Sequence, residues 1–552
     1  MLVIFISWVC LGGSAYLWGM LTLKAFGKIE MLQRKRLIYT FLCGICMLTV
    51  YAQIYSLFGG VGMIALSGVL AADLIILICY RKEIIQDLLS LIKCAGIGRI
   101  LTVLITGFLV LKISAELIYN PDTSLYHSQA IHWIEDYGAV KGLGNIHSRF
   151  AFNSSFLCLQ ALFSFRGFYF RSLHSVNGFL VWILISYALC SMKIWEQKKI
   201  SVSDFLKICL LVFESVNARE FSSPGTDLFA HSLSIFIICE WVALLEENSE
   251  DTPVFALLSI LCLYAFTLKL SSAVIILLAV LPAVRLVKAR KWREIGWYLT
   301  AGFIVVIPFL IRNIMISGYL IYPFEKLDLF RVEWKMPKGV SAYERNRTKA
   351  WAEEIFGILH LNAPITEWFP YWFQAQSRQF IALLIADIIA CITLAGYGIQ
   401  CVKRRKGWEW IHLSFVLTAC LIYWFKAAPH IRFGRPYILM PPFLVIGLFF
   451  SQFKGTKKGA AFALQLAVIG FCCKPVYSLW KFADSVIWYP ISCVDYQQVS
   501  GTEKTIDGLS FYVPDDAEPD YYLFPALSDL SIGKTGLLGN DYSDGFKALS
   551  EG

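Results

Sequence analysis

The stretch Ile295-Gly-Trp-Tyr-Leu-Thr-Ala-Gly-Phe-Ile-Val-Val-Ile-Pro-Phe-Leu-Ile311 decides the fold class of this protein. It contains no charged residue, and its length approaches the ~20 residues that a helix needs to cross a bilayer. Similar uncharged runs recur along the 552-residue chain, which is 57% hydrophobic and only 16% charged. Because backbone groups in lipid must bond to one another, the sequence predicts an all-α polytopic membrane protein.

The apolar runs predict about fourteen transmembrane helices. Their expected ranges are 2–23, 37–57, 60–80, 100–118, 173–192, 204–218, 228–245, 253–268, 270–287, 295–313, 379–400, 410–426, 437–452 and 459–477. A tight turn at Lys269-Leu-Ser-Ser272 must separate the runs 253–268 and 270–287. One long tilted helix is the alternative there, and it would reverse the orientation of every later span.

Basic residues gather in alternate loops, which sets the expected orientation. They are Lys24, Lys28, Arg34, Lys35 and Arg36, then Arg81, Lys82, Lys93 and Arg99, then Lys193, Lys198, Lys199 and Lys207, then Arg285, Lys288, Arg290, Lys291 and Arg293, then Lys403, Arg404, Arg405 and Lys406, and finally Lys454, Lys457 and Lys458. Since such loops face the cytoplasm, both chain ends are expected outside it. Outer loops then fall at 119–172, 219–227, 314–378 and 427–436.

Three parts of the chain follow from this arrangement. Residues 1–99 hold the first transmembrane helices, residues 100–477 form the core with its outer loops, and residues 478–552 form a small extracytoplasmic cap of mixed structure. The sixteen cysteines are scattered through apolar runs, as small core residues are. The net charge of +9 is spread over many loops, so we expect no nucleic-acid partner.

One polar segment between apolar runs carries Asp122, the three histidines His127, His132 and His147, and Arg149. It reads Asn120-Pro-Asp-Thr-Ser-Leu-Tyr-His127 and continues to Gly142-Leu-Gly-Asn-Ile-His147-Ser-Arg149 and Asn153-Ser-Ser155. Residues 122–138 are expected to form a helix on the outer surface, with Asp122 at its N-terminal end. Its carboxylate suits two roles there: an N-cap for free backbone N–H groups, or a general base.

A second acid, Asp227, ends the next outer loop at the same membrane surface. Two carboxylates at one depth on neighbouring spans would flank one substrate. Mg²⁺ or Mn²⁺ bound by Asp122 and Asp227 is an alternative use of this pair, because such ions prefer oxygen ligands. The histidine spacing matches no zinc signature.

Cations and polar side chains are expected at the same depth. They are Arg149, Lys269, Arg312 and Arg432, with His127, His147 and Asn153 from the first outer loop. Charged residues near lipid usually have partners or a function, although snorkelling to lipid phosphates is the alternative. Arginine suits phosphate because its planar group donates two hydrogen bonds at once. These seven residues are therefore predicted to bind phosphate or substrate.

Several of these motifs resemble an uncharacterised family of bacterial multipass membrane proteins. They are Pro121-Asp-Thr-x-x-Tyr-His127, Gly142-Leu-Gly-Asn-x-His-x-Arg149, Phe152-Asn-Ser-Ser155, Ser223-Pro-x-x-Asp227, Lys269-Leu-Ser-Ser272, Arg312-Asn-x-x-x-Ser-Gly318 and Ala428-Pro-x-x-Arg-Phe-Gly434. More distantly, the architecture is similar to the GT-C superfamily of glycosyltransferases, which use lipid-phosphate sugar donors. The sequence departs from that pattern, because three spans precede the motifs and the first long loop has no D-x-D.

This resemblance implies a GT-C-like glycosyltransferase in the bacterial inner membrane. Asp122 would be its catalytic base, and Asp227 would assist or bind metal. Its partners would be a polyprenyl-phosphate-linked sugar donor, a glycan or lipid acceptor, and membrane lipid. Two alternatives stay open: a glycan polymerase, and a transporter or flippase of an anionic glycolipid or solute. Transport is favoured if Asp73, Glu240 and Asp387, acids within apolar runs, line one path.

Overall fold

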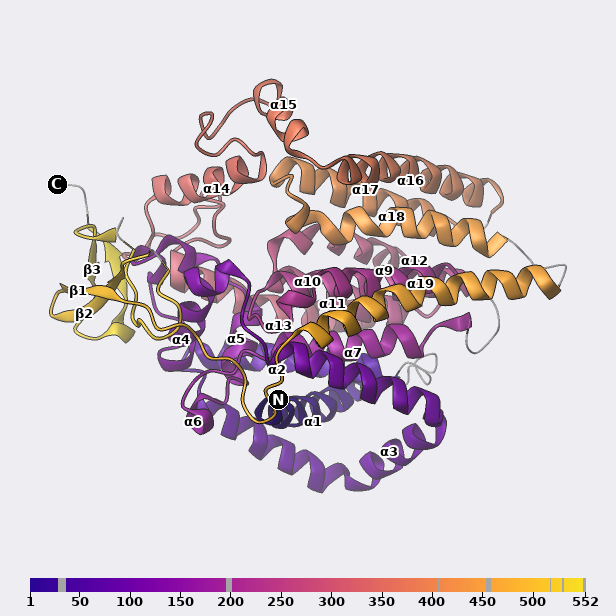
Figure 1. Ribbon diagram of the computed structural model, residues 1–552, viewed down its shortest axis with the longest axis horizontal. Helices are drawn as coiled ribbons and strands as arrows, with labels where there is room; N and C mark the ends of the chain where they lie inside the picture. Colours follow the sequence, from indigo (N-terminus) through magenta and orange to yellow (C-terminus); the bar gives the residue numbers. More distant parts are fainter. Residues whose placement is uncertain are drawn as a thin grey trace.

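The protein is a bundle of long apolar helices with a few strands at one end (Figure 1). The computed structural model describes residues 1–27, 36–194, 201–405, 407–452, 458–516, 518–528 and 531–549. Ten helices within these residues are long and apolar enough to cross a membrane, which confirms an all-α polytopic membrane protein. They are α1 (Leu2–Ala25), α2 (Arg36–Ser56), the two limbs of α3 (Met63–Ser114), α10 (Asp227–Glu246), η6 with α12 (Leu270–Ala279 and Val280–Lys288), α13 (Trp292–Ser317), α16 (Arg378–Lys403), α17 (Glu409–Ala427) and α18 (Ile431–Gln452).

The other four predicted spans are also helical. They correspond to α7 (Val176–Cys190), α9 (Val202–Val216), α11 (Thr252–Leu268) and α19 (Lys458–Ser485). The predicted turn at Lys269 is confirmed, because its extended backbone (φ −156°, ψ 130°) separates α11 from η6. The two elements then pack against each other.

Residues 81–95, which the sequence analysis assigned to a loop, are helical. Helix α3 continues through them and bends back on itself (Figure 1). Only Tyr80 and Gly96 leave the helical conformation inside it. Gly96 has φ 67° and ψ 151°, a conformation that residues with a Cβ atom avoid.

The strands mark one end of the bundle, called here the strand end (Figure 1). They form two antiparallel pairs, β1 (Gly501–Ile506) with β2 (Leu509–Pro514) and β3 (Thr535–Leu537) with β4 (Phe546–Ala548). The segment 314–378 contributes α14 (Lys338–Ala352) and α15 (Ile365–Ala375) to the same end. Residues 119–175 contribute a π-helical turn, η2 (Thr123–His127), then α4 (Ser128–Asp136), η3 (Leu143–Asn145), η4 (Ser148–Ala151), α5 (Ser155–Leu162) and α6 (Arg166–Tyr169).

The prediction that residues 122–138 lie on the surface is wrong for α4, because the C-terminal segment covers it. Every residue from Ser128 to Glu135 is buried. The Gln129 amide donates to the Asp520 carbonyl (2.7 Å) and accepts from the Ala526 N–H (3.2 Å). The ring of His132 stacks on Phe524, with centroids 3.8 Å apart. Helix α4 is thus an internal element, held between the bundle and the tail.

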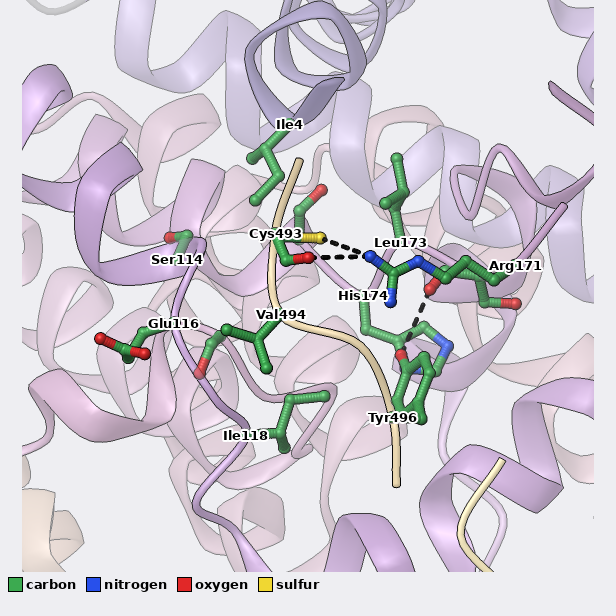
Figure 2. Close-up of a pocket in the computed structure, with 13 residues that line it drawn as sticks. Ile4, Ser114, Glu116, Ile118, Arg171, Leu173, His174, Cys493, Val494 and Tyr496 are labelled. Carbon is green, nitrogen blue, oxygen red and sulfur yellow. Dashed lines mark hydrogen bonds between the residues drawn. The ribbon is translucent and has the colours of Figure 1, made fainter. Parts of the chain in front are cut away.

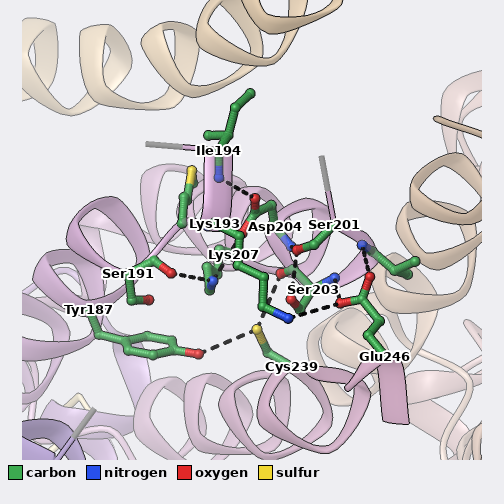
Figure 3. A network of polar contacts seen from close by, with 12 residues as sticks. Tyr187, Ser191, Lys193, Ile194, Ser201, Ser203, Asp204, Lys207, Cys239 and Glu246 are labelled. Atoms are coloured by element: carbon green, nitrogen blue, oxygen red, sulfur yellow. Dashed lines mark hydrogen bonds and ion pairs between the residues drawn. The ribbon is translucent and has the colours of Figure 1, made fainter. Parts of the chain in front are cut away.

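The opposite end of the bundle is held by buried charges (Figure 3). Lys207 and Asp204 form a fully buried ion pair (3.0 Å), and the Asp204 carboxylate also accepts the N–H groups of Lys193 and Ile194. Glu246, at the end of α10, accepts the first N–H groups of α9. Of the basic residues predicted to lie in cytoplasmic loops, the following are outside the described residues: Lys28, Arg34, Lys35, Lys198, Lys199, Lys406, Lys454 and Lys457.

Candidate functional site

Four segments bring two acids and two cations together at the strand end. Asp122 directly precedes η2, and Asp227 is the first residue of α10. Lys269 is the break between α11 and η6, and Arg432 lies in the first turn of α18. The last position differs from the prediction, which placed Arg432 in a loop before a span at 437–452. The side chain is instead carried by a helix, which fixes its direction.

Arg432 bridges the two carboxylates. Its Nε donates to Oδ2 of Asp227 at 2.7 Å, and its Nη2 donates to Oδ2 of Asp122. Lys269 donates to the other oxygen of Asp227. The side chains of both acids are 18% exposed, so the four charges attract one another more strongly than in water. Two negative and two positive charges compensate each other here.

The Asp122 side chain does not cap the helix that follows it. Instead, its backbone N–H donates to the Asn120 side chain (2.9 Å), and Asn120 donates to Oε2 of Glu220 (2.7 Å). Burial raises the pKa of Glu220, while the bond from Asn120 lowers it. Of the two roles considered for Asp122, the capping role is therefore wrong. Glu220 was missed, although its position in the loop before Asp227 was visible in the sequence.

His127 and Arg149 lie beside this group through Tyr126. The rings of Tyr126 and His127 have centroids 4.3 Å apart, and the Arg149 guanidinium is 5.7 Å from the Tyr126 centroid. Burial lowers the pKa of His127 to about 4, although Asp122 and Asp227 oppose this effect. Its Nδ1 is buried without a hydrogen-bond partner. Arg149 has no carboxylate within ion-pair distance in the described part of the chain.

Three predicted site residues contact one another or Arg149 instead of the acids. His147 accepts the Arg149 N–H (3.2 Å) and caps η4. Asn153 accepts from Nε of Arg312 (3.3 Å), whose Nη1 donates to Ser56 (2.5 Å). Among the described residues, none of these side chains hydrogen-bonds to Asp122 or Asp227. The prediction that these residues share one depth does not place them in one cluster.

The motif Asn153-Ser-Ser155 fixes the end of α11. The Ser154 hydroxyl donates to the Leu268 carbonyl (2.7 Å), and Ser155 bonds Thr267 (2.9 Å). Leu268 is the residue before Lys269, so the motif holds the turn from which Lys269 reaches Asp227. Its contribution is thus positional.

Two more polar side chains, Arg435 and His231, lie about one helical turn further into the bundle than Arg432 and Asp227. Arg435, one turn after Arg432 in α18, donates to the Asn217 side chain. His231, four residues after Asp227 in α10, is 1% exposed and its Nε2 has no hydrogen-bond partner. Spacing of i, i+4 places His231 on the same helix face as Asp227. The i, i+4 spacing of Asp227 and His231 is the sequence pattern from which His231 could have been predicted as part of the site.

The C-terminal tail touches the segment that carries Asp122. Ser124 donates to Glu518 (2.7 Å), and its carbonyl accepts the Asp520 N–H (2.9 Å). Thr535 donates to the Asn145 carbonyl (2.9 Å) and so holds the loop before Arg149. The tail therefore supports both polar loops of the site.

The donor set does not match a Mg²⁺ or Mn²⁺ site. No group of three or more His, Cys, Asp or Glu side chains suited to a metal occurs in the residues that the structure describes. Arg432 and Lys269 already share the oxygens of Asp122 and Asp227.

A separate cavity lies where the tail passes the end of α3 (Figure 2). Arg171 donates to the Cys493 carbonyl (2.8 Å), and Tyr496 bonds Nδ1 of His174. The cavity has a volume of about 20 Å³, which is room for one water molecule. It cannot hold a sugar or a lipid head group, so it is not the substrate site.

The three acids within apolar runs have separate surroundings. Asp73 accepts from Ser14 and Trp18 of α1, whereas Glu240 accepts from Tyr39 of α2 (2.9 Å) and Tyr187 of α7. Both oxygens of Asp387, in α16, are buried without a hydrogen-bond partner. The described contacts connect none of these acids to another.

The fold and this cluster define a polytopic membrane protein with an acid–base group at one end of its helices. A family of proteins described as a domain of unknown function, DUF8201, matches residues 1–439, and the chain belongs to this family. Asp122, Asp227, Lys269 and Arg432 all lie within the matched region. No curated protein and no solved structure matches the chain.

Proposed function

We propose that this protein is an inverting membrane glycosyltransferase that uses a polyprenyl-phosphate-linked sugar outside the cytoplasm. The convergence of Asp122, Asp227, Lys269 and Arg432 carries this proposal. If α7, α9, α11 and α19 are counted as spans, the chain crosses fourteen times and both ends share one side, and the basic loops favour the outside for the strand end. The fold would then be GT-C-like, and the group would meet lipid and water at the bacterial inner membrane surface.

Asp122 is the proposed base. Its Oδ2 is held by Arg432, which leaves Oδ1 to accept the proton of an acceptor hydroxyl. The acceptor oxygen forms a bond to the anomeric carbon while the bond from that carbon to the phosphate oxygen breaks. The electron pair of the broken bond stays on the phosphate, and the anomeric configuration inverts.

Arg432 and Lys269 are positioning residues in this scheme, because both already donate to the carboxylates of Asp122 and Asp227. Arg149 is the better phosphate ligand, since it lies near Tyr126 without a carboxylate partner among the described residues. A cation at that place stabilises the negative charge that builds up on the departing phosphate.

The test is transfer of a radiolabelled sugar from a polyprenyl phosphate by the reconstituted protein. Asp122→Asn should lower the rate by about 10² or more, the usual effect of losing a general base. Asp328→Asn is the matched control, because Asp328 pairs with Lys335 and Lys338 on the segment 314–378, away from the group. Full activity of a folded Asp122→Asn variant would remove Asp122 from this role.

A transporter is the second candidate, and Asp387 is the observation that favours it. A buried carboxyl group without a partner in a spanning helix suits proton binding. Loss of substrate uptake into vesicles by Asp387→Asn, with Asp122→Asn unaffected, would establish transport instead.

A further inference from the structure

The helical segment 81–95 is set apart from the two limbs of α3 that cross the bundle. Tyr80 and Gly96 break the helical conformation at its two ends. The chain therefore enters and leaves this segment through bends, and the segment forms its own short helix at the end opposite the strands (Figure 1).

One side of this segment is apolar and exposed. Ile85, Leu89 and Ile92 are 56%, 52% and 64% exposed. With about 3.6 residues per turn, they fall on one side with Leu88. Ile84 points elsewhere, since it is buried with Leu17 and Met20 of α1. The exposed apolar side thus continues the lipid-facing surface of the spans.

The acids and the lysines of the segment face different ways. Glu83 pairs with Lys24 of α1, and Asp87 pairs with Arg36 of α2 (3.1 Å). Lys82 and Lys93 are exposed and form no ion pair in the part of the chain that the structure describes. Lys82 and Lys93 are eleven residues apart, which is about three helical turns, so their side chains lie on the same side of the helix. That side borders the exposed Leu89.

We propose that residues 81–95 lie flat in the membrane surface and that Lys82 and Lys93 bind the phosphates of anionic lipids. The apolar side enters the acyl region, as in interfacial amphipathic helices, while the lysines extend along it to the head groups. The acids are neutralised from within the protein by α1 and α2, so they do not repel the lipid phosphates. This surface is remote from Asp122 and does not depend on the proposed function.

The first test measures lipid retention by the full chain in nanodiscs of phosphatidylcholine and phosphatidylglycerol. Native mass spectrometry should show preferential retention of phosphatidylglycerol by the natural protein. The double variant Lys82→Gln/Lys93→Gln should lower that preference about thirtyfold, because each lysine near an anionic surface contributes about 1 kcal/mol and about 1.4 kcal/mol is tenfold. Lys504→Gln, an exposed lysine on β1 at the other end, is the control and should change nothing.

The second test locates the segment with a photoreactive residue at position 92 or 90 of the full chain. Crosslinks to lipid from Ile92, but not from Ser90, are expected. Equal retention of the two lipids by the natural protein, or unchanged preference in the double variant, would overturn the proposal. So would crosslinks from position 92 to another polypeptide, because the side would then dock a protein.

Discussion

Nε of Arg432 lies 2.7 Å from Oδ2 of Asp227, although 205 positions of sequence separate the two residues. The same guanidinium also holds Asp122. One side chain thus joins the first polar loop, the start of α10 and the start of α18. The Arg432 side chain therefore contributes both to the stability of the strand end and to the position of Asp122, the proposed base.

Replacing Arg432 should therefore destabilise the protein. Arg432→Gln leaves Asp122 and Asp227 facing each other, and we expect a loss of about 3 kcal/mol in the free energy of unfolding. This is the low end for a broken buried pair, because the Arg432 side chain is 30% exposed. Thermal unfolding in detergent measures it. Arg435→Gln, whose partner Asn217 is neutral, should cost less, and an equal cost would contradict the bridging role.

The buried pair at the opposite end gives a second stability prediction. Lys207→Met leaves the Asp204 carboxylate buried without its cation and should cost about 3–5 kcal/mol. The double variant Asp204→Asn/Lys207→Met should be more stable than Lys207→Met alone. Lys291→Met is the control, because its pair with Glu294 is exposed and should contribute less than about 1 kcal/mol. Similar losses for the two lysines would refute a buried pair.

Because α1 and α2 pack closely, one methyl group added between them should destabilise the protein. A Cβ atom at Gly44 would collide with the backbone of Ala15. Gly44→Ala should therefore push the helices apart and cost about 1–3 kcal/mol. Gly396→Ala in α16 meets nothing and should be neutral or stabilising. Unfolding midpoints of the two variants in one detergent decide the matter.

Three buried histidines predict acid sensitivity. Burial lowers the pKa of His127 and His147 to about 4 and that of His174 to about 3. Between pH 6.5 and these values the unfolded chain binds protons that the folded protein does not, so folding stability falls as the pH falls. Above about pH 6.5 these groups contribute no pH dependence.

Melting temperatures at pH 7.5, 6 and 5 measure this effect. The His174→Gln variant should show a smaller fall than the natural protein over the same window, because one of the three groups no longer titrates. Glu220 and Glu135, whose pKa values burial raises, contribute a change of opposite sign in both proteins, so the difference isolates His174. Parallel curves for the two proteins would contradict a neutral buried His174.

Much of this architecture could be predicted from the sequence, because lipid imposes one simple rule on the backbone. Uncharged runs located the helices, and the turn at Lys269 followed from their lengths. The depth shared by Asp122, Asp227, Lys269 and Arg432 also followed. Depth says nothing about direction around the helix axis, however. Arg312 has the right depth but faces Ser56 and Asn153.

Two features depended on distant contacts that no local pattern reports. Helix α4 is amphipathic, which favoured a surface position, yet residues 520–526 of the tail cover its polar side. Charges at residues 81–99 favoured a loop, but residues 81–95 are helical and pack through Ile84 against α1. Local composition describes each of these segments correctly, but it does not say which distant part of the chain packs against the segment.

The bonds from Gln129 to the tail also set an order of biosynthesis. Gln129 leaves the ribosome 391 residues before its partner Asp520. Every charged group of the cluster is made before then, but the segment beside Asp122 lacks these contacts until residue 520 has been made. A chain that stops before residue 518 can therefore contain every helix of the bundle and still lack the contacts that support the segment beside Asp122.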